Sequence, residues 1–124
     1  MVKSRIAALP KGIQGRQGDI MFIPIPASKI PSTAKKVPFN GVYVAALGEA
    51  TGHCHSISGS PKNIEILETP NTKESDPRFI KISGKEIAEV THDEHAPIGL
   101  AEGTYMIQRA REYDPYVQER VVSD

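Results

Sequence analysis

Turn-forming residues interrupt this chain about every ten residues, and that spacing limits which folds it can adopt. The 124 residues include 10 glycines and 10 prolines, which disfavour long helices because both residue types weaken a helix interior. The segments between the turns are short, and several alternate apolar and polar side chains. The pattern predicts an all-β, mostly antiparallel protein with a single domain, built as a small barrel or a sandwich.

The expected strands and loops follow from this alternation. Seven or eight short strands are expected, over residues 19–25, 41–47, 53–58, 63–68, 78–83, 86–92 and 103–112, with 97–100 as a short segment and 117–122 as a candidate last strand. Residues 27–40 and 69–77 are expected to be loops, and Ser83-Gly84-Lys85 is a candidate for a tight hairpin turn. Residues 1–18 are expected to form an irregular basic arm, and residues 19–124 a single β domain.

Charge is distributed unevenly along the chain. Residues 1–40 contain seven Lys or Arg and one acid, for a net charge of +6, and residues 41–124 therefore carry −6 because the whole chain is neutral. This balance argues against a protein whose whole surface binds nucleic acid. The basic arm either pairs with the acidic body, within one chain or in a homo-oligomer, or contacts nucleic acid or another acidic partner.

Cysteine usage and hydropathy indicate the compartment. Cys54 is the single cysteine, which rules out an internal disulfide and suits a reducing environment. No apolar run reaches the length of a signal peptide's core or the roughly 20 residues that cross a membrane. The expectation is a soluble, cytoplasmic protein with no membrane partner.

All four histidines fall in two short pairs, within TGHCHS (51–56) and THDEH (91–95). On a strand, His53 and His55 project from the same face, whereas on a helix they would lie about 200° apart. His92 and His95 are expected at the end of a strand, where a turn brings residues i and i+3 together. Two such pairs could meet at one end of a barrel.

The chemistry of these pairs fits a divalent metal. Neutral imidazole is a ligand for Zn, Fe, Mn or Ni, and nearby carboxylates suit several of the same ions. The prediction is therefore a shared metal site formed by His53, His55, His92 and His95. If the protein is an enzyme, Glu94 or Glu49 would be the proton carrier beside a metal-activated water. Histidines at turns are also often ordinary surface residues, so a structural or pH-sensitive role is the competing interpretation.

Two resemblances extend this interpretation. The stretch Gly52-His53-Cys54-His55, followed by PIGLAEG (97–103), partially resembles the cupins, a family of small metal-binding β-barrels. The stretches GEATGHCHSI and VTHDEHAPIGLAEGTYMIQRAREYDP are similar to a group of small uncharacterised proteins encoded by bacteria and phages. The second resemblance implies no activity; for a phage-encoded protein the expected location is the virion or host cytoplasm.

Two function classes follow. The first is a metal-binding β-barrel protein that is also an enzyme acting on a small substrate if the metal keeps an open position. The second is a non-enzymatic, phage-related module whose basic arm docks on a partner or on another copy of itself. The presence or absence of bound metal in the purified protein distinguishes them.

Overall fold

The computed structural model describes residues 8–10, 12–45, 54–70 and 76–109. These residues form ten strands and one short 3-10 helix, and they contain no α-helix. The elements are β1 (Gly15–Gln17), β2 (Ile20–Pro24), η1 (Ala27–Lys29), β3 (Lys35–Val37), β4 (Val42–Ala45), β5 (His55–Ser58), β6 (Ile64–Glu68), β7 (Arg78–Ile82), β8 (Ala88–Thr91), β9 (Ile98–Leu100) and β10 (Gly103–Arg109).

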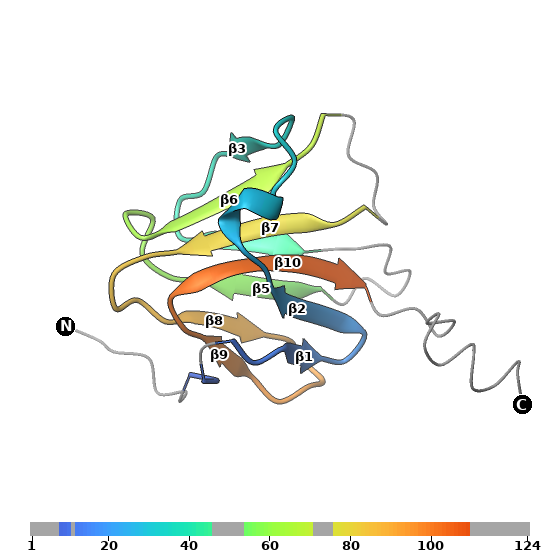
Figure 1. Cartoon of the computed structure of the whole chain (residues 1–124). Helices are drawn as coiled ribbons and strands as arrows, with labels where there is room; N and C mark the ends of the chain where they lie inside the picture. The colour runs from blue at the N-terminus through green and yellow to red at the C-terminus, as the bar shows by residue number, and fades with distance from the viewer. Residues whose placement is uncertain (1–7, 11, 46–53, 71–75, 110–124) are drawn as a thin grey trace, which may run out of the picture.

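The strands form two antiparallel sheets, one in front of the other in Figure 1. The six-stranded sheet has the order β1-β2-β10-β7-β6-β3, and the four-stranded sheet has the order β4-β5-β8-β9. The all-β, antiparallel prediction is confirmed. The two sheets form a sandwich rather than a closed barrel, so the barrel expected at the histidine site is replaced by the space between two sheets.

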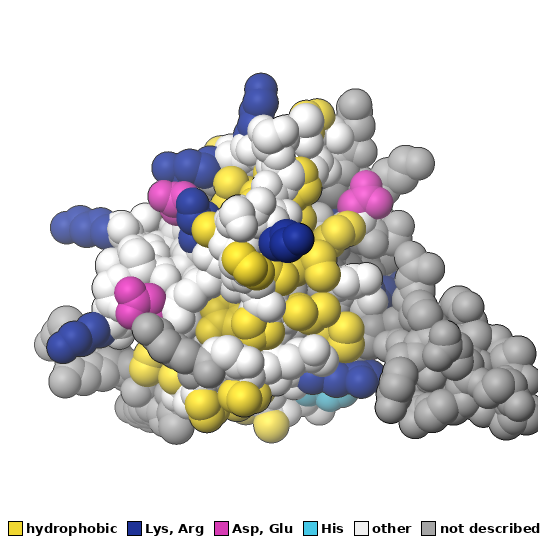
Figure 2. Space-filling view, viewed as in Figure 1, with side chains coloured by type: hydrophobic (Ala, Val, Ile, Leu, Met, Phe, Trp, Pro, Cys, Tyr) yellow, Lys and Arg dark blue, Asp and Glu magenta, His cyan; other side chains and the backbone are white. Residues whose placement is uncertain are grey.

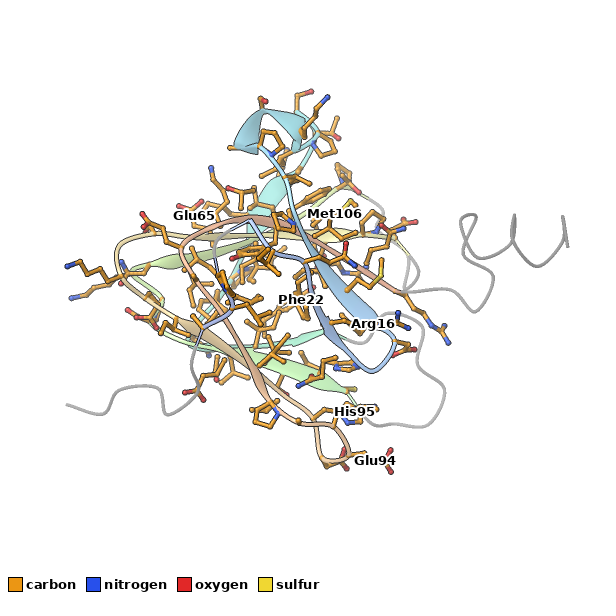
Figure 3. All side chains as sticks on the ribbon, turned by 60° about the horizontal axis from the view of Figure 1, so that its bottom comes forward. Arg16, Phe22, Glu65, Glu94, His95 and Met106 are labelled. Carbon is orange, nitrogen blue, oxygen red and sulfur yellow. The ribbon has the colours of Figure 1, made fainter. Side chains whose placement is uncertain are left out.

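The core lies between the sheets and follows from the two-residue period of the strands. Alternate side chains of β2, β5, β6 and β8 are buried because a strand projects successive residues to opposite faces. Figure 3 shows Phe22 between the two layers. The buried cluster consists of Ile20, Phe22, Ile57, Ile64, Ile66, Ile80, Ile82, Ala88, Val90, Leu100, Tyr105 and Ile107.

Two strands form where irregular structure was expected. β1 lies within the segment expected to be an arm, and it pairs with β2. A Cβ on Gly15 would lie 2.9 Å from Leu9 Cδ1 and 3.3 Å from Ile98 Cδ1, so glycine lets β1 pack against β9. β3 lies within the expected loop and pairs with the edge of β6. Its lysines are exposed, and only Val37 is packed against the core, which is why its composition resembles a loop.

The turn over Ser83-Gly84-Lys85 does not close a hairpin. β7 belongs to the six-stranded sheet and β8 to the four-stranded sheet, so the chain crosses between the sheets at this turn. Ser83 N donates to Asn63 O over 2.8 Å, which holds the start of the crossing against the beginning of β6. The hairpin expectation was wrong because turn-forming residues indicate only that the chain changes direction. They do not indicate which strand the following segment pairs with.

A polar cluster joins the two sheets near β4. Tyr43 of β4 donates its hydroxyl hydrogen to Glu68 Oε2 over 2.7 Å and accepts from Arg78 Nε over 3.2 Å. Burial, followed by the hydrogen bond to Glu68, raises the pKa of Tyr43 from 10.0 to about 12. The neutral phenol therefore connects the four-stranded sheet to β6 and β7.

No helix in the described part of the chain is both long and apolar enough to cross a membrane.

Candidate metal centre

His55 points into the interior because it lies two residues before the buried Ile57, so both side chains project from the same face of β5. In β5 the buried positions are His55 and Ile57, while Ser56 and Ser58 are half-buried. The alternation predicted for this segment is confirmed at these residues, and His55 has no solvent exposure. His53 lies outside the described residues. A fully buried imidazole needs polar neighbours, because burying an unpaired polar group is costly.

The pairing of β5 with β8 brings the second histidine pair to His55. Ser56 lies opposite Thr91, so the chain beyond Thr91 emerges beside His55. The ring centroids of His55 and His92 are 4.5 Å apart, and those of His92 and His95 are 4.6 Å apart. The rings of His55 and His95 are 6.2 Å apart. The structure thus brings together three of the four histidines that were predicted to share a site.

The three rings run from the interior to the surface. The side chain of His55 has no exposure and that of His92 has 3 %, whereas His95 is exposed. Figure 3 shows His95 in the loop between β8 and β9, with Glu94 farther out at the loop's tip. Figure 2 shows a histidine surface directly beneath a group of Arg or Lys side chains. Solvent and small solutes therefore reach the cluster from the His95 side.

A carboxylate from the opposite sheet joins the cluster. Asp19 stands in the turn between β1 and β2, and its Oδ1 lies 3.6 Å from Nε2 of His55. Its other oxygen, Oδ2, lies 3.2 Å from Nε of Arg109. The arginine holds the carboxylate in place, and the carboxylate faces the buried imidazole.

Gly18 lets the β1–β2 turn approach His95 closely. A Cβ at this position would lie 2.6 Å from His95 Nε2, closer than atoms in contact can stand. The residue also has a φ of +58°, a conformation that side chains disfavour. The backbone conformation thus favours glycine, and any larger residue would force the ring of His95 to move.

Gln17 connects His55 to β8 and to the loop that carries His92 and His95. The residue is 2 % exposed. Its Nε2 donates to Val90 O over 2.9 Å and to Ala96 O over 2.8 Å. Its Oε1 lies 2.7 Å from His55 Nδ1. One amide therefore touches β5, β8 and the loop that carries His92 and His95.

His92 has local contacts of its own. Its Nδ1 accepts the backbone N–H of Glu94 over 3.0 Å and lies 3.4 Å from Asp93 Oδ1. The Glu94 residue is exposed. Glu49, the other proposed proton carrier, lies outside the described residues.

The donor types at this site fit a divalent metal, whereas their present positions do not yet surround an ion. Three imidazoles and one carboxylate match the ligands of zinc, iron, manganese or nickel. Within the described ranges, no group of three or more His, Cys, Asp or Glu side chains is already arranged to hold a metal. The hydrogen bond from Glu94 N–H to His92 Nδ1 is one reason, because it engages a nitrogen that would otherwise be free to coordinate. Binding an ion would therefore require these groups to move from their present positions.

Sequence reasoning missed Asp19, Gln17 and Gly18. Two signals could have found them: Asp19 is the only acid among the first 40 residues, and Gly18-Asp19 has turn chemistry just before an apolar strand. Nothing in the sequence places this turn beside the histidines, because the contact joins different sheets.

The model of a family described as a domain of unknown function (DUF8820) matches residues 16–110. The chain belongs to this family. No curated protein and no solved structure matches the chain significantly. The matched range includes Gln17, Asp19 and all four histidines, and the family's description gives no activity, metal or partner.

Proposed function

We propose that this protein binds one divalent metal ion between its two sheets, with His55, His92, His95 and Asp19 as ligands. His53 precedes this strand in the sequence and remains a candidate for a further ligand. The observation that carries the proposal is the convergence of three imidazoles from β5 and the β8–β9 loop, of which the buried one, His55, faces the carboxylate of the β1–β2 turn.

The charges at the centre of the cluster favour a cation. A carboxylate oxygen and an imidazole nitrogen that carries a lone pair repel each other unless a proton or a cation lies between them. Asp19 Oδ1 and His55 Nε2 are 3.6 Å apart, in a region where the imidazole is fully buried. A divalent ion beside both atoms would satisfy them together, and low solvent exposure strengthens that interaction.

The increase in solvent exposure from His55 to His95 supports a metal ion that binds and leaves reversibly. The innermost ligand, His55, is fixed by the strand, while His95 stands at the surface. An ion can enter from the His95 side and draw the rings together. A position left open to solvent would give the ion the Lewis-acid chemistry of a metal hydrolase or a related enzyme.

The experiment is a titration of the purified, untagged, metal-free protein with Co²⁺ and Zn²⁺. The matched variants are His95→Ala and Glu94→Ala, which remove exposed neighbours in one loop. The wild type and Glu94→Ala should bind one ion per chain, with the absorption bands of cobalt in a nitrogen and oxygen site. His95→Ala should bind much more weakly. Absence of binding by the wild type, or equal binding by both variants, would contradict the proposal.

The alternative function is docking through the basic N-terminal arm over residues 1–18, of which residues 1–7 and 11 lie outside the described part of the chain. No contact among the described residues favours it specifically. Cytoplasmic location, self-association and a phage origin likewise stay predictions.

A further inference from the structure

The orientation of the Gln17 side-chain amide is determined by its neighbours. Its nitrogen faces two backbone carbonyl oxygens, those of Val90 and Ala96, at 2.9 Å and 2.8 Å. The reversed orientation would place an amide oxygen against both carbonyls, with no hydrogen between any of them. Oε1 is therefore the atom that faces His55, and it can only accept a hydrogen bond.

This orientation fixes the proton on His55. Nδ1 lies 2.7 Å from Gln17 Oε1, and two acceptors cannot share a hydrogen bond, so Nδ1 must carry a proton. A neutral imidazole has one ring proton, which leaves Nε2 with its lone pair. Nε2 is the atom that faces Asp19 at 3.6 Å.

We infer that Gln17 is a positioning residue that holds His55 in the Nδ1–H tautomer and so presents Nε2 as a metal ligand. Free histidine prefers the opposite tautomer, so the local hydrogen bond selects this one. The effect on metal affinity rests on the proposed function, whereas the tautomer itself does not.

Gln17 also sets the distance between the two histidine segments. Val90 belongs to β8, and Ala96 lies in the loop that carries His92 and His95. The same amide bonds to His55 of β5, so it fixes that loop relative to the buried imidazole. Hydrogen-bond partners of metal-bound histidines contribute roughly 10- to 100-fold in metal affinity, and we expect Gln17→Met to weaken Zn²⁺ binding by that factor.

The deciding measurement is two-bond ¹⁵N–¹H correlation NMR on ¹⁵N-histidine-labelled, metal-free protein at mildly alkaline pH. It reports directly which ring nitrogen carries the proton. The wild-type spectrum should show His55 protonated at Nδ1 and unprotonated at Nε2. A proton on Nε2, with or without one on Nδ1, would overturn the inference, and this result does not depend on the folding of any variant.

Variants of Gln17 distinguish a role in positioning His55 from a role in packing alone. Gln17→Met should shift His55 toward the Nε2–H tautomer, whereas Gln14→Met, which alters an exposed glutamine of the same segment, should leave it unchanged. Gln17→Glu keeps an acceptor opposite Nδ1 and loses both donors, so it should retain the tautomer at a lower melting temperature. An unchanged tautomer and unchanged Zn²⁺ affinity in Gln17→Met would refute the positioning role.

Failure of the inference and failure of the metal proposal give different results. If the wild type shows the Nδ1–H tautomer and binds no Zn²⁺, the assignment of Gln17 stands and the metal function falls. If Zn²⁺ binds and Nε2 of metal-free His55 is protonated, the metal function stands and the assignment falls.

Discussion

Zinc binding should raise the melting temperature of the protein. The binding free energy and the unfolding entropy, which scales with chain length, set the size of the shift. An ion that binds only the folded state adds about 2.7 kcal/mol to the unfolding free energy at a hundredfold excess over its dissociation constant. For 124 residues the unfolding entropy is on the order of 0.26 kcal/mol per kelvin. The melting midpoint should therefore rise by about 10 °C between excess chelator and this zinc concentration.

Each single ligand variant should remove most of the zinc-induced rise in melting temperature, and the losses of two such variants should not be additive. His95→Ala and Asp19→Asn each remove one ligand from one ion, so the double variant should lose little more than either single variant. The gain should be larger near pH 7.5 than near pH 5, because a metal competes with protons for the imidazole nitrogens. The assay is thermal unfolding followed by circular dichroism, with Glu94→Ala as the control that keeps the gain. A wild-type midpoint that does not respond to zinc, or additive losses in the double variant, would refute the reasoning.

Three further predictions concern the surroundings of the site and the sandwich. Gly18→Ala should lower both the melting midpoint and Zn²⁺ affinity, because its Cβ would collide with His95 and its φ is positive; an unchanged Zn²⁺ titration would argue against that contact. Tyr43 has a pKa raised to about 12, so unfolded chains ionise first and stability should fall as pH rises from 10 towards 12. Tyr43→Phe should weaken that fall relative to the wild type in urea unfolding, and a pH profile identical to that of the wild type would exclude it. Ile57→Ala should cost roughly 2–5 kcal/mol of unfolding free energy by urea unfolding, because it opens a cavity between the sheets; a cost well below 1 kcal/mol would contradict the core assignment.

The sequence predicted the elements well because most of the core is built on a two-residue period. The alternation in residues 64–68 and 103–107 appears in the structure as alternating burial, and the same period correctly placed His55 and Ile57 on one face. Elements with few inward side chains escaped prediction. β3 packs only Val37 against the core, and β1 contains a glycine where its contact with β9 is closest.

The site was predicted in part for a related reason. The spacing of the histidines predicted that the pairs share one site, and the rings of His55, His92 and His95 do lie together. Their meeting depends on the register that sets Ser56 opposite Thr91, which is a long-range property of the sheet. Asp19 and Gln17 come from the other sheet, so no local pattern could associate them with the histidines.

X-ray absorption spectroscopy of the zinc-loaded, untagged protein tests the central claim most directly. If His55, His92, His95 and Asp19 hold one ion, the spectrum should show only nitrogen and oxygen ligands at about 2.0–2.2 Å, with the outer-shell scattering of three imidazoles. That scattering should fall to two imidazoles in His95→Ala loaded at high zinc. A sulfur ligand near 2.3 Å, which Cys54 could supply, or zinc without imidazole scattering would contradict the account.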